Sequence, residues 1–233
     1  MSKIITLDQK LRFIGFRINV NQASKKIDGA DILRESDIER TLIEAAYAIQ
    51  KEHDYRLFSI LLKWIEIFGE YVIVEKFEKF SKIATREQGL NPILNAIAVW
   101  GTIHKQTKWN RLIVKSKANA YIVDKELTDS SETYPGLQDK WLKYGVKIPN
   151  KMLRNRDTDV LSVPELASQN LQFRNRLLMG SSWRSDIITA NELGFEKVSE
   201  IENVLGCSHE PAHRITKEFR IVLATRVGSA TNA

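Results

Sequence analysis

The sequence predicts an all-α protein, with an N-terminal helical bundle or series of helix-hairpin repeats followed by a smaller helical module. Glycine and proline are scarce, with 11 and 5 in 233 residues, so few turns are marked and long helices are favoured. From Ser36 onward, apolar residues recur at intervals of three and four, which is the helical period. No comparable run of strand-like alternation occurs, so helices account for the predicted core.

The first thirty residues carry only weak signals. Phe16, Ile18 and Val20 alternate with polar residues, which weakly favours a strand. The segment 19–29 is polar, and we expect it to form a loop.

The next two helices are predicted with more definite ends. Ser36 and Glu39 have the spacing of a capping box, with Ser36 as the N-cap. One apolar stripe then follows, formed by Ile38, Leu42, Ala45 and Ile49. Asp54 is placed to cap a second helix over 55–68, and this helix is apolar nearly all round, as central buried helices are. Gly69 is placed to end it.

Three further helices complete the N-terminal part. The third presents one apolar face, formed by Ile73, Phe77, Phe80 and Ala84. The fourth begins at Asn91 and Pro92, a favourable N-cap and first-turn pair. Its stripe contains Ile93, Ile97, Trp100 and His104. A fifth helix is expected over Trp109–Lys117. The short connections predict antiparallel neighbours.

Composition divides the chain into three segments. Residues 1–117 form the predicted bundle. Residues 118–169 contain loop signals such as Tyr134-Pro135-Gly136, yet they hold too many Trp and Leu residues for a free linker. We therefore expect a connector that packs on its neighbours. Residues 170–233 return to a helical pattern and form the C-terminal module.

Cysteine content and hydropathy favour a cytoplasmic protein. Cys207 is the single cysteine, so no disulfide can form within the chain, and a reducing compartment is indicated. Residues 1–20 lack the apolar core of a signal peptide. No apolar run approaches the roughly 18 residues that a membrane span needs.

The net charge of +6 predicts attraction to polyanions. The surplus is uneven, because residues 101–160 hold 12 Lys and Arg against 7 Asp and Glu. Residues 171–233 hold 8 against 7, so the C-terminal module is nearly neutral. This balance argues against a simple polyanion reader at the C-terminus.

The most informative segment runs from Val198 to Ser208. Val198, Ile201 and Leu205 share one face of a short helix, and Gly206 can take a positive φ at its end. Ser208 is placed to cap the helix that follows. That helix would bury Ala212, Ile215 and Phe219. Two helices joined by such a corner form the skeleton of a helix-turn-helix.

The last sixty residues resemble the winged helix-turn-helix domains of bacterial transcription regulators. The resemblance rests on Arg184 to Ile188, Val198 to Ile201, Val204 to Ser208, and Ala212 to Arg214. It implies a protein that binds duplex DNA and regulates transcription, reading DNA with the helix that starts at Ser208. The DNA-contacting residues it implies are Arg184, Lys197, Ser208, His209, Glu210, His213, Arg214 and Lys217. A homodimer on two half-sites is expected for such a reader.

The sequence departs from this family in three places. Glu202 stands where a small residue is usual, so it must reach toward solvent or tilt the helix pair. Thr216 stands near a position that is usually aliphatic, which thins the core. Only eleven residues follow Val222, so a full wing hardly fits, although 219–225 has the composition of one strand.

The sequence leaves open one further DNA contact and one alternative function. A basic cluster, Lys108, Arg111 and Lys115, would add phosphate contacts if it shared a helix face, although a solvated face is an equal interpretation. The alternative to DNA binding is a non-catalytic helical adaptor or scaffold whose C-terminal module binds a protein partner. The N-terminal helical region would then serve for docking or dimerisation.

Catalytic and metal-binding candidates are weak. Cys207, His209 and His213 have helical spacing for zinc, but a fourth ligand is not nearby, so outward histidines are favoured. Asp157 and Asp159 lack a third ligand, and a solvated loop is the better interpretation. His53 and Asp54 resemble half a catalytic dyad, but adjacent residues seldom present their side chains to each other, and Asp54 is better explained as a helix cap. His104 is read as a bundle residue. No phosphate-binding loop, nucleophile elbow or metalloprotease motif occurs, so we expect neither an enzyme nor a cofactor.

Overall fold

The computed structural model describes residues 5–18, 28–113, 121–122, 141, 146–147, 153–154 and 156–230, and is mostly helical. The all-α prediction is confirmed. The elements are α1 (Leu7–Phe13), α2 (Gly29–Glu35), α3 (Ile38–Glu52), α4 (Tyr55–Phe68), η1 (Gly69–Tyr71), α5 (Val74–Gln88), α6 (Pro92–Ile103), η2 (Thr107–Leu112), β1 (Tyr121–Ile122), β2 (Val146–Lys147), η3 (Asp157–Asp159), α9 (Val163–Gln169), α10 (Leu171–Met179), α11 (Trp183–Glu192), α12 (Val198–Leu205) and α13 (His209–Ala230). The short strands β1 and β2 pair in parallel.

Two helices, α1 and α2, occur within the first 35 residues, for which the sequence analysis predicted no helix. Thr6 and Gln9 form a complete capping box at the start of α1. Asp28 caps α2 by accepting a hydrogen bond from the backbone N–H of Ala30 at 2.9 Å. The expected strand at Phe16 is reduced to a single antiparallel bridge with Val160. Both helices have seven residues, too few for apolar periodicity to stand out.

The start of α3 differs by one residue from the prediction. Asp37, not Ser36, is the N-cap, because its Oδ1 accepts from the N–H of Arg40 at 3.0 Å. Ser36 instead follows α2 as its C-cap, and its hydroxyl lies 3.0 Å from that of Thr41. Both residues can cap a helix and both are buried, but the carboxylate of Asp37 also pairs with Lys76 of α5 at 2.9 Å, which holds it at the start of α3.

Helix α4 is the central helix of the body, as its apolar surface predicted. Asp54 caps it, accepting from the N–H of Leu57 at 2.8 Å. Trp64 is fully buried, and its indole N–H donates to the carbonyl of Ile14 at 2.6 Å. Gly69 does follow the helix, but with an αR conformation that tightens the chain into η1. Its lack of a side chain matters because a Cβ there would lie 2.3 Å from Oε1 of Gln106.

The fourth predicted helix is confirmed and the fifth is shorter than expected. Asn91 caps α6 and Pro92 occupies its first turn. Helix α5 begins at Val74 with Ile73 as its N-cap. In place of a helix over Trp109–Lys117, a 3-10 segment spans Thr107–Leu112, and residues 114–117 lie outside the described part of the chain. Trp109 is buried and packs so closely on Gly101 that a Cβ there would meet its ring at 2.5 Å.

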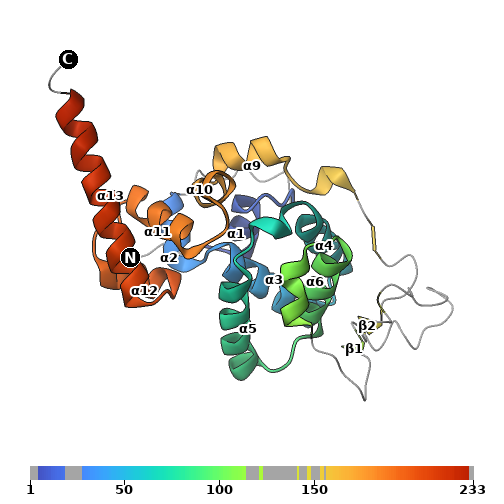
Figure 1. Cartoon of the computed structure of the whole chain (residues 1–233). Helices are drawn as coiled ribbons and strands as arrows, with labels where there is room; N and C mark the ends of the chain where they lie inside the picture. Colours follow the sequence, from blue (N-terminus) through green and yellow to red (C-terminus); the bar gives the residue numbers. More distant parts are fainter. Residues whose placement is uncertain are drawn as a thin grey trace.

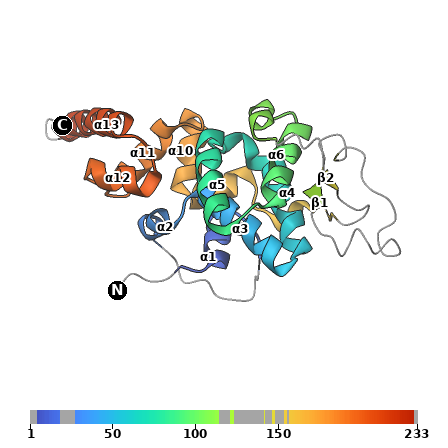
Figure 2. The same ribbon diagram turned by 90° about the horizontal axis from the view of Figure 1, so that it is seen from below.

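Two hydrophobic clusters organise the molecule. The larger one lies in the body, around α3, α4 and α6. The smaller one lies among α11, α12 and α13, which occupy one end of the molecule in both views (Figures 1 and 2). The clusters cross the segment limits expected at 117 and 170. Ala30 and Leu33 of α2 pack in the smaller cluster, and Phe173 of α10 packs in the larger one.

Several described residues of the expected connector pack on the body. Trp141 is buried and stacks on Trp100, with ring centroids 5.1 Å apart. Helix α9 starts after Ser162, which forms a capping box with Glu165. Among the described helices, none has the length and apolar character needed to cross a membrane.

Candidate nucleic-acid interface

Helices α11, α12 and α13 form a three-helix unit around a shared apolar centre. Its buried members are Ile187, Ala190, Phe195, Ile201, Leu205, Ala212 and Ile215. Helix α13 packs on both α11 and α12, and α2 packs beside α12. The stripe predicted for α12 therefore points inward, with Ile201 and Leu205 fully buried and Val198 partly so.

The corner between α12 and α13 has the conformation that the glycine predicted. Gly206 adopts φ 71° and ψ 21°, the left-handed region. A Cβ at this position would meet Cζ of Phe80 at 2.6 Å. Lys79 Nζ donates to the Gly206 carbonyl at 2.6 Å. Because Phe80 and Lys79 both belong to α5, the corner is fixed against the body as well as within the unit.

The first half of α13 has one buried side and one exposed side. Ala212 and Ile215 face the core, whereas His209, Glu210 and His213 are exposed. Ser208, Arg214 and Lys217 are exposed too, as are Arg184 and Lys197 on the neighbouring segments. All the residues expected to face DNA therefore lie on the surface of the unit.

Both arginines of this surface are paired with carboxylates. Arg214 Nε lies 2.9 Å from Glu210, and Glu218 lies 3.6 Å from its Nη1. The hydrogen bond with Glu210 raises the pKa of Arg214. Arg184 pairs with Glu218 at 2.8 Å. Within the described residues, no ion pair involves Lys197 or Lys217, so these two ammonium groups are the free cations of the surface.

Both departures inside the unit are accommodated by polar contacts. Glu202 is partly exposed, and its carboxylate lies 2.5 Å from Nδ1 of His209, so it reaches outward. Thr216 is buried, and its hydroxyl accepts from the amide of Asn191 at 3.2 Å. At the position of Thr216, where a thinner core was expected, the buried hydroxyl is thus hydrogen-bonded to Asn191.

The segment 219–225, expected as a strand, is helical. Helix α13 continues without a break to Ala230 and projects from the body (Figure 1). The β-branched residues there favoured a strand, but no neighbouring strand is present in the described region to pair with them. Ile221 is 57% exposed, and Val222 and Leu223 are exposed as well.

The basic cluster before the connector is not one cationic face. Lys108 is partly buried, and its ammonium donates to the carbonyls of Glu70 and, at 2.7 Å, Val72. Burial, together with the nearby charge of Arg176, lowers the pKa of Lys108 to about 8. Lys108 is thus a structural donor rather than a phosphate contact.

The other two members of that cluster are not placed as a shared face. Arg111 is exposed and pairs with Glu78 at 2.7 Å and with Glu75 at 3.4 Å. Lys115 lies outside the described residues. The 3-10 geometry of η2 also replaces the α-helical spacing on which the shared face depended.

The sequence analysis missed a buried ionic cluster beside the unit. Arg176 of α10 makes a paired contact with Glu39, at 2.6 and 2.8 Å, and another with Asp186, at 2.8 Å through both Nε and Nη2. Lys76 of α5 lies 2.5 Å from Asp186 and 2.9 Å from Asp37. All five side chains are fully buried.

Electrostatics keeps this cluster charged. Burial alone would raise the pKa of Asp186, but the charges of Arg176 and Lys76 outweigh it and hold the value well below its usual range. Burial would likewise lower the pKa of Lys76, and its carboxylate partners reverse that and raise it. No ligand can reach these groups, so the cluster joins α3, α5, α10 and α11 structurally. Charged side chains are almost never fully buried unless they are paired, and the pairing partners lie on other helices. Local sequence patterns therefore do not indicate that these five residues are buried.

The remaining candidates have structural roles. Asp157 pairs with Lys63 at 2.7 Å. His53 ends α3 in a left-handed conformation, and the ring of His104 packs at a tilt against that of Trp100, with centroids 4.4 Å apart. Among the described residues, no group of three or more His, Cys, Asp or Glu side chains is arranged to hold a metal.

Comparison with known proteins gives no relative. No family model matches the chain, and neither a curated protein nor a solved structure does. The proposals below therefore rest on the geometry of this molecule.

Proposed function

We propose that the three-helix unit is a helix-turn-helix that binds duplex DNA, with α13 as the reading helix. The observation that carries this proposal is the Gly206 corner, which leaves one side of the first half of α13 exposed. A DNA-reading helix needs that arrangement, because its early side chains must enter the major groove while its other side stays packed. The function is non-catalytic, and regulation of transcription is the role it implies.

The charges of the unit suggest how the contacts divide. Lys197 and Lys217 are exposed without an ion pair in the described region, so they are suited to phosphate oxygens. His209, Glu210 and His213 present hydrogen-bonding groups for base edges. The pairs of Arg184 and Arg214 are exposed to solvent and therefore weak, so phosphate can replace their carboxylate partners at little cost.

A salt series tests the proposal directly. We expect the affinity for random duplex DNA to fall steeply with salt, and the slope to flatten in Arg214→Ala with Lys217→Ala. Each lost phosphate contact should reduce the slope by about 1. The matched control is Lys51→Ala with Arg86→Ala, which removes two exposed cations from α3 and α5. Equal slopes in all three proteins would contradict DNA binding by α13.

A second function is favoured by one observation. Ile221, Val222 and Leu223 are exposed on the projecting half of α13, and exposed apolar groups of this kind often mark protein contacts. The alternative is a non-catalytic adaptor whose α13 binds a protein partner or a second copy of the chain. It predicts weak DNA binding with little salt dependence, together with association that Ile221→Glu abolishes in light-scattering measurements.

A further inference from the structure

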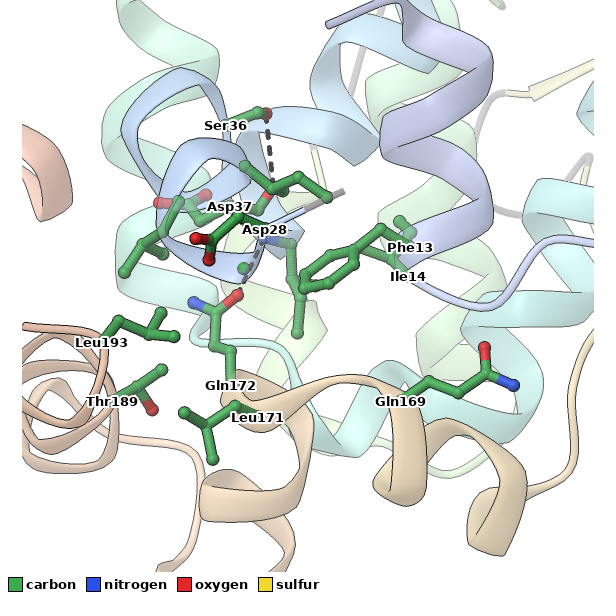
Figure 3. Close-up of a pocket in the computed structure, with 14 residues that line it drawn as sticks. Phe13, Ile14, Asp28, Ser36, Asp37, Gln169, Leu171, Gln172, Thr189 and Leu193 are labelled. Carbon is green, nitrogen blue, oxygen red and sulfur yellow. Dashed lines mark hydrogen bonds between the residues drawn. The ribbon is translucent and has the colours of Figure 1, made fainter. Parts of the chain in front are cut away.

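A cavity of about 490 Å³ lies where the body meets the three-helix unit. Its walls come from α1, α2, α9, α10 and α11, and they are mainly apolar (Figure 3). Phe13 lines one side, and Leu171 and Leu193 line the other. The volume is within the range of roughly 300–1,000 Å³ found for small-molecule sites.

One polar group in this cavity has an unmet hydrogen-bonding need. Gln172 is 4% exposed, and its Oε1 accepts from the backbone N–H of Ile38 at 3.3 Å. That contact fixes the amide orientation, because Oε1 must face the donor. The amide nitrogen then has no hydrogen-bond partner among the described residues. In Figure 3 the amide nitrogen lies on the side of Leu193, away from Phe13.

An unpartnered buried donor destabilises the folded chain, and an acceptor in the cavity would remove that cost. The charges around the cavity limit what that acceptor can be. Asp28 and Asp37 are the charged members of the described lining, and no Lys or Arg accompanies them there. Asp37 is paired with Lys76 behind the wall, so Asp28 supplies the uncompensated negative charge of the cavity. A carboxylate or phosphate would meet repulsion there, whereas a neutral carbonyl would not.

We propose that this cavity is a binding site for a small, neutral, mainly apolar molecule whose carbonyl oxygen accepts a hydrogen bond from Nε2 of Gln172. Phe13, Leu171 and Leu193 contact its apolar part. This site does not depend on DNA binding, since the ligand is recognised by the cavity alone. Its position between α2 and α11 gives the bound molecule contacts on both sides of the junction.

The test uses two probes of one shape on the full chain: 2-acetylnaphthalene and 2-naphthoate. We expect calorimetry to show that the neutral ketone binds and that the carboxylate binds at least about tenfold more weakly, because of the charge of Asp28. Gln172→Met removes the donor and should weaken ketone binding by about fivefold, which corresponds to one hydrogen bond. Gln88→Met, the same change at an exposed position outside the cavity lining, should leave binding unchanged.

A second variant guards against misfolding of Gln172→Met, which also removes the acceptor for Ile38. Leu171→Trp narrows the cavity and leaves the Gln172 side chain in place, and it should weaken ketone binding by at least about tenfold. In the wild-type protein, the ketone should shift the side-chain amide resonances of Gln172. The proposal is overturned if the ketone does not bind the wild-type chain, if the carboxylate binds as well as the ketone, or if Leu171→Trp binds unchanged.

Discussion

At the scale of single residues, the ionic cluster determines how this protein should respond to acid. Asp186 is buried between Arg176 and Lys76, and both cations favour its ionised form. Its pKa is therefore lower in the folded chain than its ordinary value of 3.8. A group of this kind contributes stability that is present above the unfolded-state pKa and is lost as the pH falls below it.

We expect the free energy of unfolding to fall between about pH 5 and pH 2, and Asp186→Asn to show a flatter dependence over that range. The variant should also be less stable at pH 7 by about 3–5 kcal/mol, because it leaves two buried cations partly unpaired. Urea unfolding at several pH values measures both quantities. Asp157→Asn is the matched control, since Asp157 pairs with Lys63 but is largely exposed. Parallel pH profiles for wild type and Asp186→Asn would contradict the assignment.

Sequence reasoning at this scale worked where the chemistry is local. Asp54 and Asn91 were predicted as caps because a cap needs only its own helix, and both were found in that role. Ser36 was mistaken for the cap of α3 because Asp37 has the same local competence. The carboxylate of Asp37 forms an ion pair with Lys76 of α5, and residue spacing within one helix cannot predict that contact.

At the scale of elements, the corner between α12 and α13 carries most of the functional argument. Gly206 combines a positive φ with close contact to Phe80, so two penalties apply to any side chain. Gly194 also has a positive φ, of 86°, but nothing lies within 4 Å of where its Cβ would be. Comparing substitutions at Gly194 and Gly206 therefore distinguishes the cost of backbone strain from the cost of steric contact with Phe80.

Gly206→Ala should therefore destabilise the chain more than Gly194→Ala. Backbone strain alone predicts a loss of ~1 kcal/mol for Gly194→Ala. The contact with Phe80 should raise the loss to about 2–4 kcal/mol for Gly206→Ala, because overpacking adds 1–3 kcal/mol. Thermal or urea unfolding of the two variants checks this order. Equal losses would mean that Phe80 of α5 can move away from a Cβ at position 206 at no cost in stability.

The elements also show where periodicity was sufficient. Helix α4 was predicted with its observed limits because its apolar run is long and both ends carry signals. The end of α13 was not, since Ile221 to Leu223 suit a strand as well as a helix. A strand needs a partner, and the continuing helix needs only the preceding turns. The lone Gly228 did not stop it.

At the scale of the whole molecule, the all-α class followed from composition, whereas the way its parts join did not. Arg176 contacts Glu39 of α3, Asp186 of α11 and the carbonyl of Tyr71, so one side chain links the body to the three-helix unit. These partners are 137, 10 and 105 residues away in the chain. A single sequence does not show which residues far apart in the chain are in contact. The segment limits at 117 and 170 therefore followed changes in composition, not the packing of the helices.

That linkage predicts cooperative unfolding. In the wild-type chain, exchange-protected amides of α4 and α12 should lose protection with similar free energies, because breaking the ionic cluster exposes unpaired charges on both sides. Arg176→Met removes the link and should let α12 open at a lower free energy than α4, with an overall loss of about 3–5 kcal/mol. Native-state hydrogen exchange measures the two helices separately. Arg174→Met, an exposed arginine on the same helix, should leave their difference unchanged. If α4 and α12 still open together in Arg176→Met, then the apolar contacts of α2 with α12 couple the two parts, and the buried charges only add to the stability of a unit that is already continuous.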